Sequence, residues 1–274
     1  MTMQDFEFIR NLAYQESGIV LPERKQHMVY SRLSRRVRQL KFSNFSQYCA
    51  FIQQHPEEMI NFINALTTNL TAFFREQHHF DYLEQHLVPL WKRKSHRRLR
   101  VWSSACSSGE EPYSIAMTLA QHFPPPNWDL KILATDLDTN VLNKANTGRY
   151  NIDSIANLPI RLQKECFEIN PRENSASIVE QCKKLVHFKQ LNLLGDWPMK
   201  GSFDLIFCRN VLIYFDNPTK AKIIEKFRQL LSDDGHLFIG HSETLHNISQ
   251  DFTLIGQTIY QPIYLNAQRR TSII

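Results

Sequence analysis

The sequence lacks the features of a membrane-spanning or secreted protein. No apolar run approaches the length of a membrane span, and the amino terminus, MTMQDFEFIR, carries acids where a secretory signal needs a basic region and then an apolar one. The five cysteines are odd in number and never spaced C-x-x-C, which argues against a disulfide framework and a structural zinc site. We therefore expect a cytoplasmic protein without direct membrane insertion, whose cysteines are reduced and mostly buried.

Glycine is scarce, at 8 of 274 residues, and the glycine-rich nucleotide motifs are missing. Neither G-x-G-x-x-G nor a P-loop occurs, and Gly240-His241-Ser242 falls short of a nucleophile elbow because Thr244 replaces the second glycine. The adjacent His78 and His79 should project to different sides of a helix, so we predict surface residues and no metal site. The net charge of +5 favours an acidic partner but is too small to diagnose nucleic acid.

The pattern of apolar residues divides the chain into a helical part and an alternating part. From Asp5 to about His86 apolar residues recur at spacings of three and four, which predicts helices throughout. From Leu99 onward the strand candidates LRVWSSA, KILATD, VHFKQLN, FDLIFCRN and HLFIGHS alternate with helices over 112–123, 138–147 and 218–231. This alternation predicts an α/β fold with a mainly parallel sheet covered by helices on both faces.

Two segments depart from that alternation. The last apolar segment, FTLIGQTIYQPIYL, has no intervening helix and should form an antiparallel hairpin or edge strand. Between Tyr150 and about Lys184, CFEIN and SIVEQCKKL flank a polar run and predict a small antiparallel β insertion. We therefore expect a helical domain over 1–72, a connector over 73–98, and an α/β domain over 99–274 with the insertion at about 155–188.

The stretch RVWSSACSSGEEPYSIAM, Arg100 to Met117, has the form of a strand, a tight loop and a helix that begins near Pro112. Glu110 and Glu111 at the helix mouth would repel a phosphate, so the loop suits a cationic ligand. Asp136 ends the next strand, at the spacing where a carboxylate commonly accepts ribose hydroxyls. S-adenosylmethionine meets both demands, although these residues alone leave open an ordinary strand-to-helix turn with a capping acid.

A basic helix lies over 32–41. Its apolar residues, Leu33, Val37 and Leu40, share one face, and its arginines point the other way or lie at the flank: Arg32, Arg35, Arg38 and Arg36. Such a face is either solvated surface or a docking surface for an acidic partner.

Five blocks resemble one family, the chemotaxis receptor methyltransferases of the CheR type. In the family's order they are TTNLTAFFRE, RVWSSACSSGEEPYSIAM, ATDLDTNVLNKANTGRY, LNLL with FDLIFCRNVLIYF, and DDGHLFIGHSE. Ser104-Ala105 departs from the Ala-Gly of many relatives. The resemblance implies a class I S-adenosylmethionine-dependent methyltransferase, Rossmann-like with an antiparallel carboxyl-terminal hairpin, preceded by a small all-α domain and carrying an antiparallel β insertion.

The resemblance also implies an activity: methyl transfer from S-adenosylmethionine to receptor glutamates, leaving S-adenosylhomocysteine and glutamyl methyl esters. It implies that the cofactor is bound by Asn69, Thr71, Arg75, Ala105, Glu111, Asp136, Asn192, Leu193, Arg209 and Asn210. Arg75 and Tyr214 are expected to orient the target carboxylate, and neither should transfer a proton. The Asn/Asp-Pro-Pro-aromatic motif of base-amino methyltransferases is absent, which disfavours a nucleic-acid substrate; a cofactor sensor without catalysis is a further alternative.

The implied partner is the cytoplasmic domain of transmembrane chemoreceptors, and the arginine face should dock on its acidic helices. We expect a monomer that binds no nucleic acid. Some family members tether a receptor peptide on the edge of the inserted sheet through a glycine-bearing turn. Because no glycine occurs between Tyr150 and Leu194, we expect no such tether here.

Overall fold

Four helices form the amino-terminal domain in the computed structural model, which describes residues 1–263. They are α1 (Met3–Ser17), α2 (Gln26–Gln39), α3 (Phe45–Gln54) and α4 (Glu58–Leu66), and a 3₁₀ turn, Glu23–Lys25, precedes α2. Thr2 and Asp5 cap the start of α1 reciprocally, and Gly18, with a φ of 69°, ends it in a left-handed conformation. The apolar faces meet in a core around Phe6, Leu33 and Phe62, which confirms the predicted helical domain.

The prediction of helix up to His86 is wrong for residues 67–77, which form a non-helical connector that ends in turns. Thr67 already has an extended backbone, and the Asn69 side chain donates 2.7 Å to the carboxylate of Asp138 instead of facing a helix neighbour. Helical structure resumes at α5 (His78–Tyr82), continues through one π-helical turn and ends with α6 (Val88–Lys92). Hydrogen bonds to the α/β domain therefore override the local helical pattern.

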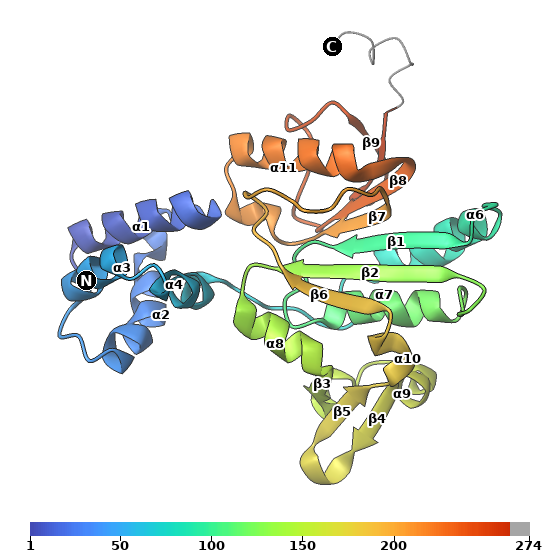
Figure 1. Cartoon of the computed structure of the whole chain (residues 1–274), viewed down its shortest axis with the longest axis horizontal. Coiled ribbons are helices and arrows are strands. Elements are labelled where there is room, and N and C mark those ends of the chain that lie inside the picture. The colour runs from blue at the N-terminus through green and yellow to red at the C-terminus, as the bar shows by residue number, and fades with distance from the viewer. Residues whose placement is uncertain (264–274) are drawn as a thin grey trace.

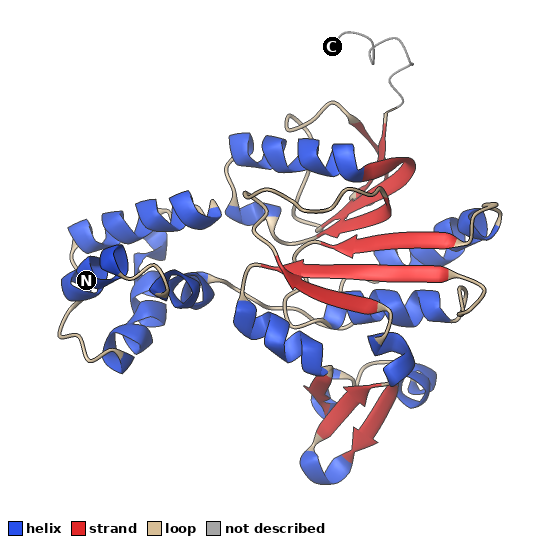
Figure 2. Cartoon of the chain, viewed as in Figure 1, coloured by secondary structure: helices blue, strands red, loops and turns tan. Residues whose placement is uncertain are grey.

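A seven-stranded sheet forms the centre of the α/β domain (Figure 2), with the strand order β6-β2-β1-β7-β8-β10-β9. The strands are β1 (Arg98–Ser103), β2 (Asp129–Asp136), β6 (Val186–Gln190), β7 (Phe203–Cys208), β8 (Leu231–Ile239), β9 (Phe252–Gly256) and β10 (Ile259–Pro262). The pairs from β6 to β8 are parallel, whereas β10 is antiparallel to both β8 and β9. The predicted sheet and terminal hairpin are thus confirmed; Tyr264 and Leu265, in the same predicted segment, lie outside the described residues.

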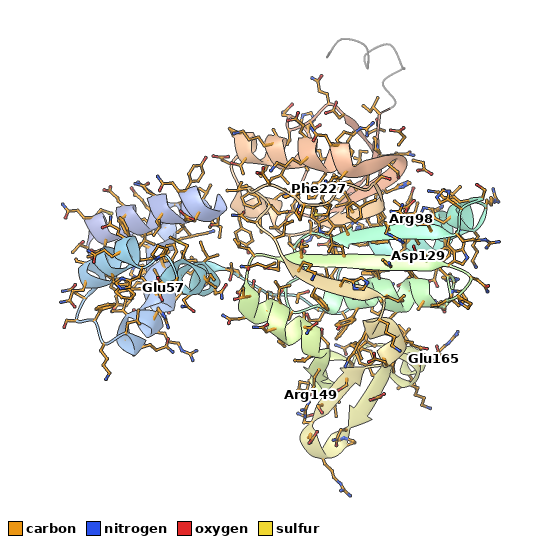
Figure 3. The ribbon with its side chains drawn as sticks, viewed as in Figure 1. Glu57, Arg98, Asp129, Arg149, Glu165 and Phe227 are labelled. Atoms are coloured by element: carbon orange, nitrogen blue, oxygen red, sulfur yellow. The ribbon has the colours of Figure 1, made fainter. Side chains whose placement is uncertain are left out.

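Helices cover both faces of this sheet, because neighbouring residues of each central strand point to opposite sides. Val101 packs in the core that includes α7 (Glu110–Ala120), whereas Trp102 packs beneath α11 (Asn217–Leu230). The ring of Phe227, labelled in Figure 3, lies 5.2 Å from the Trp102 ring between their centroids. Arg98 and Asp129 are the first residues of the neighbouring strands β1 and β2, and they lie at the strand ends farthest from the helical domain (Figure 3). The carboxyl ends of these strands therefore point toward that domain.

A smaller antiparallel sheet lies below the main one in Figure 1, after α8 (Thr139–Thr147). Its order is β3-β5-β4, from β3 (Arg149–Asn151), β4 (Phe167–Asn170) and β5 (Ser175–Ile178), with α9 (Ile160–Cys166) before β4 and α10 (Glu180–Lys183) after β5. The insertion thus begins before the predicted residue 155, and 186–188 belong to the main sheet. The second half of SIVEQCKKL is α10 rather than strand, and Asn174, with a φ of 46°, supplies the left-handed turn residue in place of glycine.

Two further expectations concern the cysteines and membrane spans. All five cysteines are free and buried, as predicted. Among residues 1–263, no helix combines the length and apolar character that crossing a membrane requires.

Candidate functional site

A cavity is lined by residues of the helical domain and by residues that follow β1, β2 and β7. Figure 1 shows that the carboxyl ends of β1 and β2 point toward the helical domain. Every residue assigned from the sequence to the cofactor or to catalysis lines it: Asn69, Thr71, Arg75, Ala105, Glu111, Asp136, Asn192, Leu193, Arg209, Asn210 and Tyr214. The helical domain adds Ser17, Ile19, Leu21, Lys25, Met28 and Leu66. The empty volume is about 1130 Å³, a figure that includes open solvent at the mouth.

The loop between β1 and α7 is held by backbone hydrogen bonds at both of its sides. The N–H of Ser104 donates 2.8 Å to the carbonyl of Phe207, and the N–H of Cys106 donates 2.8 Å to that of Thr135. Gly109 has a φ of 96°, and a Cβ there would lie 2.8 Å from the Tyr150 hydroxyl and 2.9 Å from the Ala145 Cβ. Only glycine fits this turn without a clash.

Glu111, in the first turn of α7, lines the cavity with about 11% of its side chain exposed. Its carboxylate accepts 2.7 Å from the Ser103 hydroxyl and 3.2 Å from Nη1 of Arg209. Burial raises the pKa of Glu111, and the nearby Arg209 charge opposes that rise. A second cation at this point would favour the ionised form further, so the position suits a ligand ammonium group.

Asp136, the last residue of β2, uses both oxygens to order the surrounding loops. One oxygen accepts 2.8 Å from the N–H of Ser107 and the other 3.0 Å from the N–H of Asp138. Burial raises the pKa of Asp136, while these N–H donors act in the opposite direction. Each carboxylate oxygen retains a lone pair, which is what two vicinal hydroxyls of a ribose need.

Arg209, after β7, is almost completely buried and ties three segments together. It pairs with Glu111, lies 3.4 Å from a carboxylate oxygen of Glu76, and donates from Nη2 to the carbonyl of Arg75. Arg75 itself is half-buried and donates 2.9 Å to the carbonyl of Leu70. Nη1 and Nη2 of Arg209 are therefore engaged by protein groups, whereas its buried Nε has no hydrogen-bond partner among the described residues. Arg75 has no acid partner among those residues.

The other predicted residues are held by hydrogen bonds that link the two domains. Asn192 donates 2.7 Å to the carbonyl of Glu16 at the end of α1, and the carbonyl of Tyr214 accepts 2.9 Å from the N–H of Val20. Asn69 binds Asp138, as described above. The cavity thus joins segments that are up to about two hundred residues apart in the sequence. Both the helical domain and the α/β domain contribute to its lining.

Two acids outside the predicted set hold the cavity together. Glu76 accepts 3.2 Å from Asn210, 2.8 Å from Nδ1 of His241 and 3.2 Å from the N–H of His241. Burial opposes ionisation of Glu76, but the hydrogen bond from His241 and the charge of Arg209 lower its pKa to about 2. Glu243 is also buried and accepts from three backbone N–H groups, those of Gly240, Asn210 and Ile213, at 2.6, 2.9 and 3.3 Å. In the sequence, the only sign that Glu76 and Glu243 have a role is that each ends a block shared with the family, FFRE and GHSE.

The prediction of two surface histidines is wrong for His79, which is fully buried; His78 is half-buried. Burial and the charge of Arg209 lower the pKa of His79 to about 3, so the ring is neutral at pH 7. The two rings and Glu76 offer ligand atoms within 4.8 Å of one another, although adjacent histidines were expected to diverge. Because Glu76 already serves Asn210, Arg209 and His241, we assign this group to the packing of the connector.

Fewer arginines of α2 are exposed than the sequence predicted, and none of them lines the cavity. Arg32 donates to the carbonyls of Leu66 and Thr67 at the end of α4, and Arg36 pairs with the buried Glu58 at 2.5 Å. These two arginines hold the helical domain together rather than pointing away from it. Arg35 and Arg38 remain exposed.

Comparisons with known proteins agree with this architecture. A family model described as "CheR methyltransferase, SAM binding domain" matches residues 69–261, and one described as "CheR methyltransferase, all-alpha domain" matches residues 4–67. "Chemotaxis protein methyltransferase 2" of Pseudomonas aeruginosa is 45% identical over 267 residues, which cover 95% of this chain and 94% of that protein. "Chemotaxis protein methyltransferase" of Escherichia coli is 46% identical over 262 residues, with 93% and 89% covered. The chain therefore belongs to the CheR family of S-adenosylmethionine-dependent chemotaxis protein methyltransferases.

Proposed function

We propose that this protein transfers methyl groups from S-adenosylmethionine to glutamate side chains on the cytoplasmic helices of transmembrane chemoreceptors. The products are glutamyl methyl esters and S-adenosylhomocysteine, and the reaction serves chemotactic adaptation. One observation carries the proposal: carboxylates suited to a cationic cofactor and cations suited to a carboxylate substrate line the same cavity. We place the enzyme in the cytoplasm as a monomer.

The cofactor half of the cavity fits S-adenosylmethionine by its chemistry. Asp136 offers carboxylate lone pairs to ribose hydroxyls, and Glu111 offers a negative charge to the ammonium group. The rest of the cofactor surface is assigned to Asn69, Thr71, Arg75, Ala105, Asn192, Leu193, Arg209 and Asn210. When bound, the cofactor supplies a methyl group on a cationic sulfur.

Arg75 and Tyr214 act on the substrate by binding and orienting its carboxylate. A glutamate is already ionised near neutral pH, so neither residue has to take a proton. The reaction neutralises two opposite charges, and water stabilises the separated ions more than the transition state. Fixing the carboxylate with these two side chains in place of water therefore favours the displacement.

The test of this assignment is Arg75→Ala. We expect turnover to fall about a hundredfold, the size of effect that a lost positioning contact can have. Cofactor affinity, measured by calorimetry, separates a substrate role from a cofactor role. Full turnover with normal cofactor affinity would show that Arg75 does not orient the carboxylate.

Receptor docking is assigned to the exposed pair Arg35 and Arg38. Because surface ion pairs are screened by salt, raised ionic strength should weaken receptor binding. Arg35→Glu with Arg38→Glu should raise KM for a receptor fragment severalfold and leave kcat unchanged. Unchanged receptor methylation by this double variant would remove the docking proposal.

The inserted sheet is not assigned a tethering role. A receptor fragment without its carboxyl-terminal peptide should be methylated as fast as one that retains it. A large loss on removing the peptide would show that the sheet edge binds it after all.

The decisive experiment is transfer of labelled methyl to a panel of receptor cytoplasmic fragments and total RNA, followed by mild alkali. Label on receptor protein that alkali releases as methanol is the expected result, because esters hydrolyse under these conditions. Alkali-stable label on RNA would retain the cofactor and overturn the substrate. Cofactor binding without any transfer would identify a sensor instead of an enzyme.

A further inference from the structure

Lys25, just before α2, is a half-buried cation in the cavity with no acid beside it. Its Nζ lies 5.5 Å from the centroid of the Tyr214 ring, and its side chain lines the same cavity as Arg75. Burial lowers the pKa of Lys25, and the charged neighbours that act on it, Arg24 and Arg32, are cations. Over residues 1–263, its ammonium group forms neither a salt bridge nor a hydrogen bond with the protein.

Among residues 1–263, some buried or half-buried cations are paired with acids, whereas Arg75, in the same cavity, is not. Lys94 contacts the carboxylate of Asp204 at 2.8 Å, and Arg209 contacts that of Glu111 at 3.2 Å. Removing a cation from water is costly unless an anion or hydrogen-bond acceptors compensate. Lys25, like Arg75, lines the cavity without an acid partner among the described residues, so an anion in the cavity would be attracted by both.

That anion has to come from outside the protein. The two acids that line the cavity are engaged, Glu111 with Ser103 and Arg209, and Asp136 with backbone N–H groups. Lys25 enters from the helical domain, on the segment whose Val20 N–H binds the carbonyl of Tyr214. It thus approaches the predicted substrate residues from the side opposite the sheet.

We infer that Lys25 binds the carboxylate of the incoming glutamate from the helical side of the cavity, as a substrate residue additional to Arg75 and Tyr214. This inference rests on the proposed function. In the reaction a carbon–oxygen bond forms as the carbon–sulfur bond breaks, so the carboxylate becomes a neutral ester and the sulfonium a neutral thioether. The ammonium group of Lys25 attracts the carboxylate but not the ester, and the contact therefore favours substrate entry and product release.

The experiment compares Lys25→Met, which keeps the side-chain length and removes the charge, with Lys25→Arg, which keeps the charge. Lys144→Met is the matched control, because Lys144 also lies over a tyrosine, 5.9 Å from the Tyr150 ring, but on α8 and outside the cavity. For each variant we would measure kcat and KM on a receptor fragment, cofactor affinity by calorimetry, and the thermal unfolding midpoint.

For Lys25→Met we expect kcat/KM for the fragment to fall about tenfold, as for one lost charge-assisted contact. Cofactor affinity and the unfolding midpoint should stay at the wild-type values, Lys25→Arg should recover most of the loss, and Lys144→Met should show none. A parallel loss of cofactor affinity would assign Lys25 to the cofactor carboxylate instead and overturn the inference. A Lys25→Met enzyme with the wild-type kcat/KM would overturn this inference and leave the proposed function standing. A wild-type protein that does not methylate the fragment would overturn both.

Discussion

The two sides of the cavity are built in different ways. On the sheet side, Asp136 and Glu111 use their oxygens to bind loop N–H groups, a hydroxyl and a guanidinium, so their positions are fixed before a ligand arrives. The helical side presents apolar residues such as Ile19 and Leu21, and its one cation lining the cavity, Lys25, has no acid partner in the described part of the chain. Under the proposed function, we expect the acids of the sheet side to bind the cofactor, which every turnover uses, and Lys25 to meet the substrate from the helical side.

Removing Asp136 should produce the largest effect on the sheet side. Asp136→Ala deletes the contacts to two hydroxyls and leaves the Ser107 and Asp138 N–H groups unpaired, so cofactor affinity should fall about a hundredfold, or about 3 kcal/mol. Calorimetric titration measures it, with the exposed Asp153→Ala as the control. A fall in cofactor affinity of less than about threefold would show that Asp136 does not bind the ribose, and it would contradict the assignment of the cofactor to the sheet side.

Glu76 should be the next most sensitive position. Its folded-state pKa of about 2 lies below the ordinary 4.5, so its ionised form stabilises the fold above pH 4.5, and this contribution is lost as pH falls toward 2. Glu76→Gln should therefore lower the free energy of unfolding at pH 7 by about 2–3 kcal/mol. Urea titrations at pH 7 and 3.5 test the sign, with the exposed Glu57→Gln as the control; a deficit that does not shrink at pH 3.5 would contradict it.

A glycine at the end of α1 tests how the helical side is held. A Cβ on Gly18 would meet a Leu194 side-chain atom at 2.9 Å, and the φ of 69° disfavours any residue with a Cβ. Gly18→Ala should cost about 1 kcal/mol of unfolding free energy and raise KM for the receptor fragment more than the Kd of the cofactor.

The control for that variant is Gly201→Ala, because an added Cβ there meets only an Arg98 nitrogen at 3.6 Å. Equal losses of cofactor and substrate binding in Gly18→Ala would show that the two sides of the cavity do not act separately.

The smallest effect is expected at the outer contact between the domains. The Tyr14 hydroxyl donates 2.8 Å to the carboxylate of Asp216 at an exposed position. Tyr14→Phe should therefore change the free energy of unfolding by less than about 1 kcal/mol, since water replaces the lost partner. Thermal denaturation measures this, and a loss larger than that of Gly18→Ala would reverse the ranking.

Periodic apolar patterns predicted most of the fold. The alternation after Leu99 gave the parallel sheet because each strand and helix buries a face that its own residues define. The connector over 67–77 and the start of the insertion could not be read in this way. Their conformations depend on partners distant in the sequence, such as the Asp138 carboxylate that binds Asn69.

The sequence by itself determined the chemical character of the site: two acids after adjacent strands, an arginine in the connector and a tyrosine after β7, all within blocks that resemble one family. Only the tertiary structure decided how these groups are used. It paired Arg209 with Glu111, withdrew Arg32 and Arg36 from the docking surface, and left Lys25 without an acid inside the cavity. The physical reason is that residue type fixes charge and hydrogen-bonding capacity, whereas the partner that satisfies a buried charge is chosen by packing across the whole chain.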